Sequence, residues 1–294
     1  MTIKLCLDTL FRDLNQIRQS NPVIHNITNL VVMPITANML LALGASPIMA
    51  HAEAETAEIA QLSQALVLNI GTLDKHWVDA MAAAQKAALN SGIPIIFDPV
   101  GAGASRYRTE TAKKILAQGV TLIRGNASEM MALENEQIKT KGVDSTQASH
   151  EALSAAQFIA KKYQCTVVVS GKTDLIVHQD QTIMLDYGTP LLTKVVGMGC
   201  TLTAIIAAFL SVNSNPLLAA MHAVALFGLL GELSEQQATG PGSFYIRLLD
   251  NLYTLKQTDL EPFVTRSALS AYSQQLDFRQ GAAKMKQPEC MHDT

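Results

Sequence analysis

The chain has 294 residues, of which 48% are hydrophobic and 16% are charged, and its formal net charge is -3. This composition predicts a large buried core and excludes an intrinsically disordered chain. It also lacks the basic excess with which proteins bind DNA or RNA phosphates, so we expect no nucleic-acid partner.

Cysteine usage and the N-terminal segment indicate the compartment. The sequence contains four cysteines, at Cys6, Cys165, Cys200 and Cys290. No two of them have the C-x-x-C spacing of a zinc cluster, and so few cysteines suit a reducing cytosol. The segment before Ser20 is patterned as an amphipathic helix and lacks the features of a signal peptide. We therefore expect a cytoplasmic protein.

Two apolar stretches, Leu30–Ala50 and Pro216–Leu233, require a check for membrane spans. A span needs about 20 consecutive apolar residues. Pro34, Asn38 and Gly44 interrupt the first stretch, and the second contains a histidine and a glutamate. Both are typical of buried core helices, and we expect no membrane partner.

The first 170 residues alternate between apolar runs of strand length and longer helical patterns. The predicted strands are Val23–Ile27, Pro47–Ala50, Leu66–Ile70, Pro94–Asp98, Thr121–Arg124 and Thr166–Ser170. The predicted helices between them are Thr36–Leu43, Thr56–Gln64, Lys75–Asn90, Thr109–Gln118, Ser128–Leu133 and His150–Lys162. This alternation predicts an α/β fold with a central, mainly parallel sheet covered by helices on both faces.

The pattern changes after residue 170. Three short runs separated by polar turns predict an antiparallel edge of the sheet: Asp174–Val177, Thr182–Leu185 and Leu191–Val195. Three helices should follow, at about Cys200–Val212, Leu217–Gln237 and Phe244–Leu255. No linker or repeat divides the chain, so we expect a single domain over residues 1–294, with a frayed tail after about Gln280.

The segment Gly197-Met198-Gly199-Cys200 lies at the start of a predicted helix. Glycines at such a junction let backbone N–H groups converge, and the helix N-terminus adds partial positive charge. The segment is therefore a candidate anion hole for a phosphoryl group, or alternatively a turn that allows close packing. Cys200 in the first turn is either a reactive thiol favoured by the helix dipole or a small buried side chain.

Other candidate residues stand at the ends of predicted strands, where parallel α/β sheets bind ligands. Asp98 can reach a magnesium ion or form the turn before Pro99. Arg124 can bind a phosphate. Glu129 has capping-box spacing from Asn126, yet its carboxylate would also suit a magnesium ion.

Two further patterns are weak candidates for chemistry. The segment that begins at Ser170 lacks the first glycine of a P-loop, although the end of this strand can still contact nucleotide. Three histidines, His25, His51 and His222, lie in or beside apolar segments. We interpret them as hydrogen-bonded structural residues rather than metal ligands.

These segments together resemble the hydroxyethylthiazole kinase family of ribokinase-like kinases. Gly197-Met198-Gly199-Cys200 is similar to the G-x-G-D signature of ribokinase-like kinases, with Cys in place of Asp, and Asn126-Ala127-Ser128-Glu129 is similar to their N-x-x-E motif. Further matches are His25–Asn29, Leu41–Ala50, Leu68–Leu73, Asp98–Gly103 and Gly240–Phe244. Met198 departs from the family, in which small residues are common at that position.

The resemblance implies a reaction and a site. ATP would phosphorylate the hydroxyethyl group of 4-methyl-5-(2-hydroxyethyl)thiazole, with magnesium required. By position, Met49, Gly197 and Asn29 would bind this thiazole alcohol, and Arg124 and Ser170 would bind ATP. Asp98 and Glu129 would serve magnesium, and Cys200 would be the catalytic residue in place of the usual Asp. The family also implies a homotrimer with active sites near subunit boundaries.

Three other interpretations stay open. The first is a kinase of the same fold that acts on another vitamin-precursor alcohol, a pyrimidine or pyridoxal. The second is a nucleotide-dependent dehydratase of this fold. The third is a binder of thiazole or nucleotide without catalysis.

Overall fold

The computed structural model describes residues 4–134 and 145–264, so the tail predicted after about Gln280 lies outside the described residues. An eight-stranded sheet runs through the molecule in the order β2-β1-β3-β4-β5-β6-β7-β8. The strands are β1 (Val23–Ile27), β2 (Ser46–Ile48), β3 (Ala65–Asn69), β4 (Ile95–Asp98), β5 (Leu122–Asn126), β6 (Thr166–Ser170), β7 (Asp174–His178) and β8 (Gln181–Leu185). All pairings from β2 to β6 are parallel, whereas β7 and β8 add antiparallel strands. The predicted mainly parallel sheet with an antiparallel edge is confirmed.

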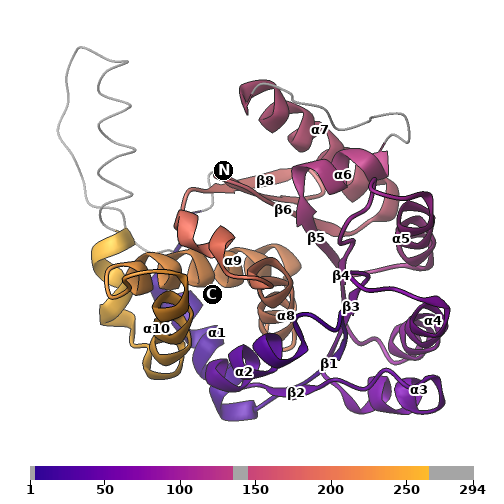
Figure 1. Ribbon diagram of the computed structural model, residues 1–294, viewed down its shortest axis with the longest axis horizontal. Coiled ribbons are helices and arrows are strands. Elements are labelled where there is room, and N and C mark those ends of the chain that lie inside the picture. The colour runs from indigo at the N-terminus through magenta and orange to yellow at the C-terminus, as the bar shows by residue number, and fades with distance from the viewer. Residues whose placement is uncertain (1–3, 135–144, 265–294) are drawn as a thin grey trace.

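Helices cover both faces of the sheet, as Figure 1 shows. One face carries α3 (Glu53–Leu62), α4 (Lys75–Asn90), α5 (Arg106–Gln118), α6 (Ala127–Glu134) and α7 (Ser145–Tyr163). The other face carries α1 (Leu7–Ser20), α2 (Met33–Leu43), α8 (Met198–Leu210), α9 (Pro216–Glu235) and α10 (Pro241–Thr254). The two buried apolar clusters of the core therefore lie on opposite sides of the sheet.

Strand β4 shows why the sequence of a central strand is apolar throughout. Ile96 packs into the cluster with α8 and α9, while Ile95 and Phe97 pack into the cluster on the opposite face. Successive side chains of a strand point to opposite faces, and both faces here are covered. The strand then ends at Asp98, whose carboxylate is consequently buried at the edge of the core.

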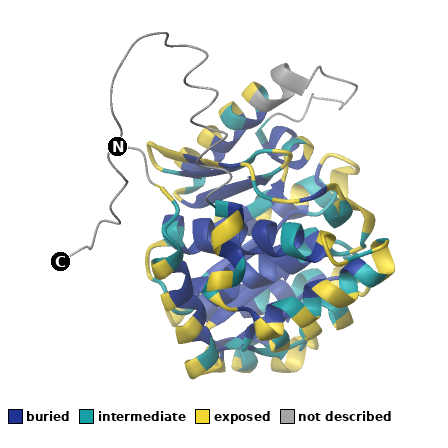
Figure 2. Cartoon of the chain, turned by 90° about the vertical axis from the view of Figure 1, so that its left-hand side faces the viewer, coloured by how far each residue is buried: buried dark blue, intermediate teal, exposed yellow. Residues whose placement is uncertain are grey.

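Helix α9 belongs to the helical layer on the side of the molecule that faces the viewer in Figure 2, and most of its residues are buried. Its length and hydropathy would suit a membrane span, but 83% of its apolar window is buried inside the protein. Asn215 caps the helix by accepting hydrogen bonds from the N–H groups of Leu217 and Leu218. Helices α8 and α10 contact α9, so the apolar sequence is that of a core helix. The other apolar stretch forms α2, β2 and their connections.

The predicted strand at Leu191–Val195 is wrong, because Pro190–Lys194 forms a 3₁₀ helix, η1. Thr189 caps it by accepting a hydrogen bond from the Leu191 N–H, and Pro190 occupies the first turn, where its missing N–H costs nothing. Leu192 then packs against α9, since a Cβ added to Gly231 would lie 3.1 Å from its Cδ1. The sequence signal for the start of this helix was the pair Thr189-Pro190, a capping residue followed by a proline.

Candidate active site

The predicted site residues lie in a row across one edge of the sheet. The residues near or just beyond the carboxyl ends of β2, β1, β3, β4, β5 and β6 are, in that spatial order, Met49, Asn29, Asn69, Asp98, Arg124 and Ser170, with Arg124 two residues before the end of β5. Parallel strands present their carboxyl ends at the same edge, where ligands of α/β proteins bind. Only Asn69 was absent from the prediction.

Helix α8 begins at this edge with the Gly197–Cys200 segment. Gly197 adopts the left-handed conformation (φ 83°), and the first helical hydrogen bond runs from the Thr201 N–H to the Gly197 carbonyl. The N–H groups of Met198, Gly199 and Cys200 therefore have no acceptor within the helix. A Cβ on Gly199 would lie 2.5 Å from Nη1 of Arg124, so only glycine allows the guanidinium to approach the helix start. The segment thus lies beside a cation at the carboxyl edge of the sheet.

Asp98 is buried at the centre of the row. Its Oδ2 accepts hydrogen bonds from Asn69 Nδ2 and Thr203 Oγ1, both at 2.9 Å. Its Oδ1 is buried and accepts no hydrogen bond of normal geometry from the described residues. Burial raises the pKa of Asp98 to about 6, and the charge of Glu129 adds to this, while Arg124 opposes it. The two hydrogen bonds of normal geometry to this carboxylate therefore both go to Oδ2, and Cys200 also lies close enough to lower the pKa of Asp98.

A chain of amides connects Asp98 to Cys200. Asn69 Oδ1 accepts a hydrogen bond from Asn29 Nδ2 at 2.9 Å, and the same Nδ2 lies 3.6 Å from Cys200 Sγ. Sequence reasoning missed Asn69 and Thr203. The only signals in the sequence were that Asn69 is a polar residue at the end of an apolar strand and that Thr203 is a polar residue in the first turns of α8. Neither signal identifies the hydrogen-bond partner unless the order of the strands in the sheet is known.

Arg124 and Ser170 lie together, as the resemblance implies for an ATP site. Arg124 Nε donates a hydrogen bond to Ser170 Oγ at 2.8 Å across the adjacent strands β5 and β6. Because Nη1 faces Gly199, this guanidinium spans the space between the end of β6 and the start of α8. The segment after Ser170 continues into β7 rather than a helix, so the rejection of a P-loop is correct.

Glu129 has two structural contacts besides its proximity to Asp98. Asn126 and Glu129 form the capping box expected from their spacing, with reciprocal bonds of 2.8 and 2.9 Å. Glu129 Oε1 also accepts the Gly101 N–H at 2.8 Å, which ties α6 to the loop after β4. Both carboxylate oxygens of Glu129 thus accept hydrogen bonds from backbone N–H groups, those of Gly101 and Asn126.

Cys200 does not have the activated thiol that its place in the first helical turn suggested. Burial raises the pKa of Cys200 to about 12, and the negative charge of Asp98 contributes in the same direction. Arg124 and the amide contacts oppose this shift but do not cancel it. At neutral pH the side chain is therefore a thiol, which can orient a neighbouring hydroxyl but is a poor resting base.

No cluster of three or more His, Cys, Asp or Glu side chains suited to a metal occurs among residues 4–134 and 145–264. Magnesium in nucleotide sites, however, uses one or two carboxylates together with phosphate oxygens and water. Asp98 fits this requirement because its Oδ1 is a carboxylate oxygen that accepts no hydrogen bond of normal geometry from the described residues, and Glu129 lies close enough to affect the pKa of Asp98. The side chains present are compatible with such an ion.

The three histidines have the structural contacts expected of them. His25 Nε2 bonds the Ala50 carbonyl at 2.8 Å, His51 Nδ1 bonds the Met49 carbonyl at 3.2 Å, and His222 Nδ1 bonds Asp13 at 2.7 Å. His51 also stacks on Trp77. Two of these contacts thus hold the loop that carries Met49, which is half-buried at the outer end of the row.

Arg108 is a further residue that the sequence did not indicate. Its guanidinium donates hydrogen bonds of 2.7 to 2.8 Å to the carbonyls of Ile70, Gly71 and Val100. It therefore joins the loop after β3 to the loop after β4, and so fixes the backbone on either side of Asp98.

Comparisons with known proteins give consistent results. A model described as the hydroxyethylthiazole kinase family matches residues 14–258. A hydroxyethylthiazole kinase of Desulfotalea psychrophila is 47% identical over 254 residues, which are 86% of this chain and 93% of the relative. The solved structure of a hydroxyethylthiazole kinase protein from Pyrococcus horikoshii OT3 is 40% identical, with a TM-score of 0.79 and coverage of 86% and 95%. A ribokinase-like superfamily protein of Enterococcus faecalis V583 is 17% identical, with a TM-score of 0.58 and coverage of 86% and 96%, and shares the fold.

Proposed function

Since the chain belongs to the hydroxyethylthiazole kinase family, we infer that it transfers the γ-phosphoryl group of ATP to the hydroxyethyl group of 4-methyl-5-(2-hydroxyethyl)thiazole, in thiamine salvage. The observation that carries this inference is the close approach of Arg124 to Gly199. A guanidinium and free helical N–H groups converge there on one point beside Asp98, which suits a group that gains negative charge during transfer.

The residues at this point have complementary roles. The anion hole of residues Gly197 to Cys200 stabilises the migrating phosphoryl group through its N–H groups, and Arg124 with Ser170 binds the ATP phosphates. Asp98 and Glu129 hold magnesium, which when bound neutralises phosphate charge. Asn29, Met49 and Gly197 form the pocket for the thiazole alcohol.

Cys200 orients the hydroxyl of the alcohol. Because its thiol already carries a proton, the hydroxyl proton passes late in transfer to an oxygen of the transferred phosphoryl group. Phosphoryl transfer passes through a loose transition state, so little deprotonation is needed early. This explains why a protonated thiol is tolerable where related kinases carry a carboxylate: positioning and charge stabilisation supply most of the rate.

The protein acts in the cytoplasm as a homotrimer, with each site close to a subunit boundary. Exposed apolar side chains border the site: Leu30 and Val31 follow Asn29, and Val196 precedes Gly197. They lie near one another because a Cβ on Gly197 would lie 2.7 Å from Val32. Covering them with a neighbouring subunit would remove this apolar area from water.

The experiment is phosphate transfer from ATP to the thiazole alcohol with the purified protein, with and without magnesium, followed by mass. The expected products are the alcohol monophosphate and ADP, only with magnesium. Parallel reactions with a pyrimidine alcohol and pyridoxal test the acceptor. Release of inorganic phosphate without a phosphorylated alcohol would instead indicate a dehydratase, and binding without turnover would indicate a binder.

A further inference from the structure

Asn69 lies between the two halves of the candidate site. Its side chain is 1% exposed at the end of β3, with β1 on one side and β4 on the other. Nδ2 donates to Asp98 Oδ2, while Oδ1 accepts hydrogen bonds from Asn29 Nδ2 and from the Gly71 N–H, each at 2.9 Å. One buried amide thus contacts the residue on the alcohol side and the residue on the phosphate side.

These contacts determine which way the Asn69 amide faces. A backbone N–H can only donate, so the Gly71 N–H requires the oxygen of Asn69 on its side. Nδ2 of Asn69 must then face Asp98, where a carboxylate oxygen accepts. The reversed amide would bring two donors together at Gly71 and two acceptors together at Asp98, and burial makes both unfavourable.

The orientation of Asn69 in turn fixes that of Asn29. Asn29 must present Nδ2 to Asn69 Oδ1, and the same Nδ2 contacts Cys200 Sγ. In the part of the chain that the structure describes, nothing donates a hydrogen bond to Asn29 Oδ1. Gly71 also takes part, because a Cβ there would lie 2.6 Å from Asn29 Nδ2.

We propose that Asn69 is a positioning residue for alcohol recognition: it holds the Asn29 amide so that Oδ1 of Asn29 accepts the hydrogen bond of the substrate hydroxyl. The proposal rests on the proposed function, since it assumes an alcohol as the second substrate. Without Asn69 the side-chain amide of Asn29 is free to rotate by half a turn. Nδ2 of Asn29, which is a donor, can then occupy the position in which Oδ1 would accept the hydrogen bond from the substrate. A ligand that offers a hydroxyl proton loses affinity as a result.

The test is a comparison of Asn69→Ala with Asn69→Asp in calorimetric binding of the thiazole alcohol. Aspartate keeps the oxygen that faces Gly71 and Asn29, whereas alanine removes it. The second oxygen of the aspartate faces Asp98 Oδ2, so the two carboxyl groups retain one proton between them, which bridges them as the amide N–H did. We expect Asn69→Ala to weaken alcohol binding by about 3- to 10-fold, the effect of one hydrogen bond, and Asn69→Asp to retain affinity within about twofold. Because Asn69 also bonds Asp98, the readout is the affinity for the alcohol rather than kcat or the KM for ATP.

A double-mutant cycle tests whether Asn69 acts through Asn29. Adding Asn69→Ala to Asn29→Ala should weaken binding by no more than about twofold, because the contact that Asn69 organises is already absent. Asn213→Ala, which removes a half-buried asparagine that bonds Asp13 instead, is the matched control and should leave alcohol affinity unchanged. Additive losses of alcohol affinity in the double variant would overturn the proposal. So would a correlation between the alcohol affinity of each variant and its thermal unfolding midpoint, because the loss would then reflect general destabilisation.

Failure of the proposed function gives a different result. If the wild type binds the thiazole alcohol without phosphorylating it, the kinase assignment fails while the binding cycle still decides the role of Asn69. If it binds no thiazole alcohol, the side-chain amide signals of Asn29 in nuclear magnetic resonance decide it. The Asn29 amide protons should be protected from exchange with solvent in the wild type and in Asn69→Asp, and should lose this protection in Asn69→Ala. Equal protection in all three proteins would overturn the proposal.

Discussion

Cys200 occupies a position where a carboxylate is usual in ribokinase-like kinases, and its environment keeps it a thiol. Burial and the charge of Asp98 raise the pKa of Cys200 to about 12. Aspartate at this position would be a readier proton acceptor, so we expect Cys200→Asp to hold kcat within about tenfold or to raise it. Cys200→Ala should lower kcat by about 10-fold, because the hydroxyl loses its orienting contact. Steady-state kinetics check both, and an alanine variant as fast as wild type would exclude this role.

Asp98 imposes a cost on the fold that its proposed role in magnesium binding would explain. Burial raises its pKa to about 6, so its folded-state contribution to stability is present in acid and is lost as pH rises through about 6. At pH 8 we expect the thermal unfolding midpoint of Asp98→Asn to be equal to or higher than that of the wild type, because the amide carries no charge that has to be buried. The same variant should lose about 100-fold or more of kcat/KM, since the carboxylate is missing. Thermal scans and kinetics on one preparation test both outcomes.

The activity of the wild type should depend on pH for the same reason. If magnesium binds the ionised carboxylate, as proposed, protons compete with it below about pH 6. The magnesium concentration for half-maximal rate should therefore increase as pH falls from 7 to 5, and saturating magnesium should restore part of the rate. A magnesium requirement that is independent of pH would contradict the assignment of Asp98.

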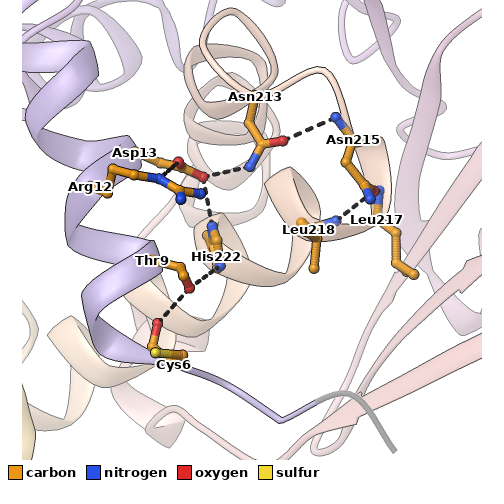
Figure 3. A network of polar contacts seen from close by, with 9 residues as sticks. All are labelled: Cys6, Thr9, Arg12, Asp13, Asn213, Asn215, Leu217, Leu218 and His222. Atoms are coloured by element: carbon orange, nitrogen blue, oxygen red, sulfur yellow. Dashed lines mark hydrogen bonds and ion pairs between the residues drawn. The ribbon is translucent and has the colours of Figure 1, made fainter. Parts of the chain in front are cut away.

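The contacts between elements add a second buried charged network, far from the strand ends. In Figure 3, Asp13 of α1 accepts hydrogen bonds from His222 of α9 at 2.7 Å and from Asn213 of the preceding loop at 2.6 Å. Burial raises the pKa of Asp13, but these hydrogen bonds together with the charges of His222 and Arg12 outweigh it, and the net shift is downward. The network fixes α1 against the apolar helix α9, where packing alone would permit sliding.

Removal of this carboxylate should therefore affect stability and leave the site intact. We expect Asp13→Ala to lower the free energy of unfolding by about 3–5 kcal/mol, because His222 and Asn213 lose a buried partner. Urea unfolding measures this, and the loss should diminish below pH 3.8, where the lowered pKa is approached. Asp79→Ala, which breaks the exposed Lys75–Asp79 pair, is the control and should leave the urea midpoint nearly unchanged. Equal effects of the two variants would contradict a structural role for the network.

The elements also explain which features the sequence could predict. A strand such as β4 is recognisable because both of its faces are apolar, and the strand-end rule then draws attention to Asp98 and Arg124. The role of Asn69 could not be predicted, because its partners are 40 and 29 positions distant and depend on β1 and β4 being its neighbours. The segment after β8 was misassigned because its apolar run fits a strand and a 3₁₀ turn equally well, and only the Thr189-Pro190 cap distinguishes them.

At the scale of the whole molecule, the proposed trimer accounts for apolar side chains that no described element covers. Leu30 is 62% exposed and directly follows Asn29, so a partner that covers it would also close the alcohol side of the site. Leu62 is 64% exposed but ends α3 at the opposite end of the sheet, before β3 begins. The two leucines are matched in type and exposure and differ in their distance from the site.

This pair allows the assembly and the site to be tested together. Light scattering should give the wild type a mass near three times 31.7 kDa. Leu30→Asp places a charge in the proposed interface, where desolvation is costly, so we expect dissociation toward monomers and a KM for the alcohol increased by about 10-fold or more. Leu62→Asp should leave both mass and KM unchanged. A wild-type monomer with full activity would disprove the trimer, and a Leu30→Asp trimer with wild-type KM would place the interface elsewhere on the molecule.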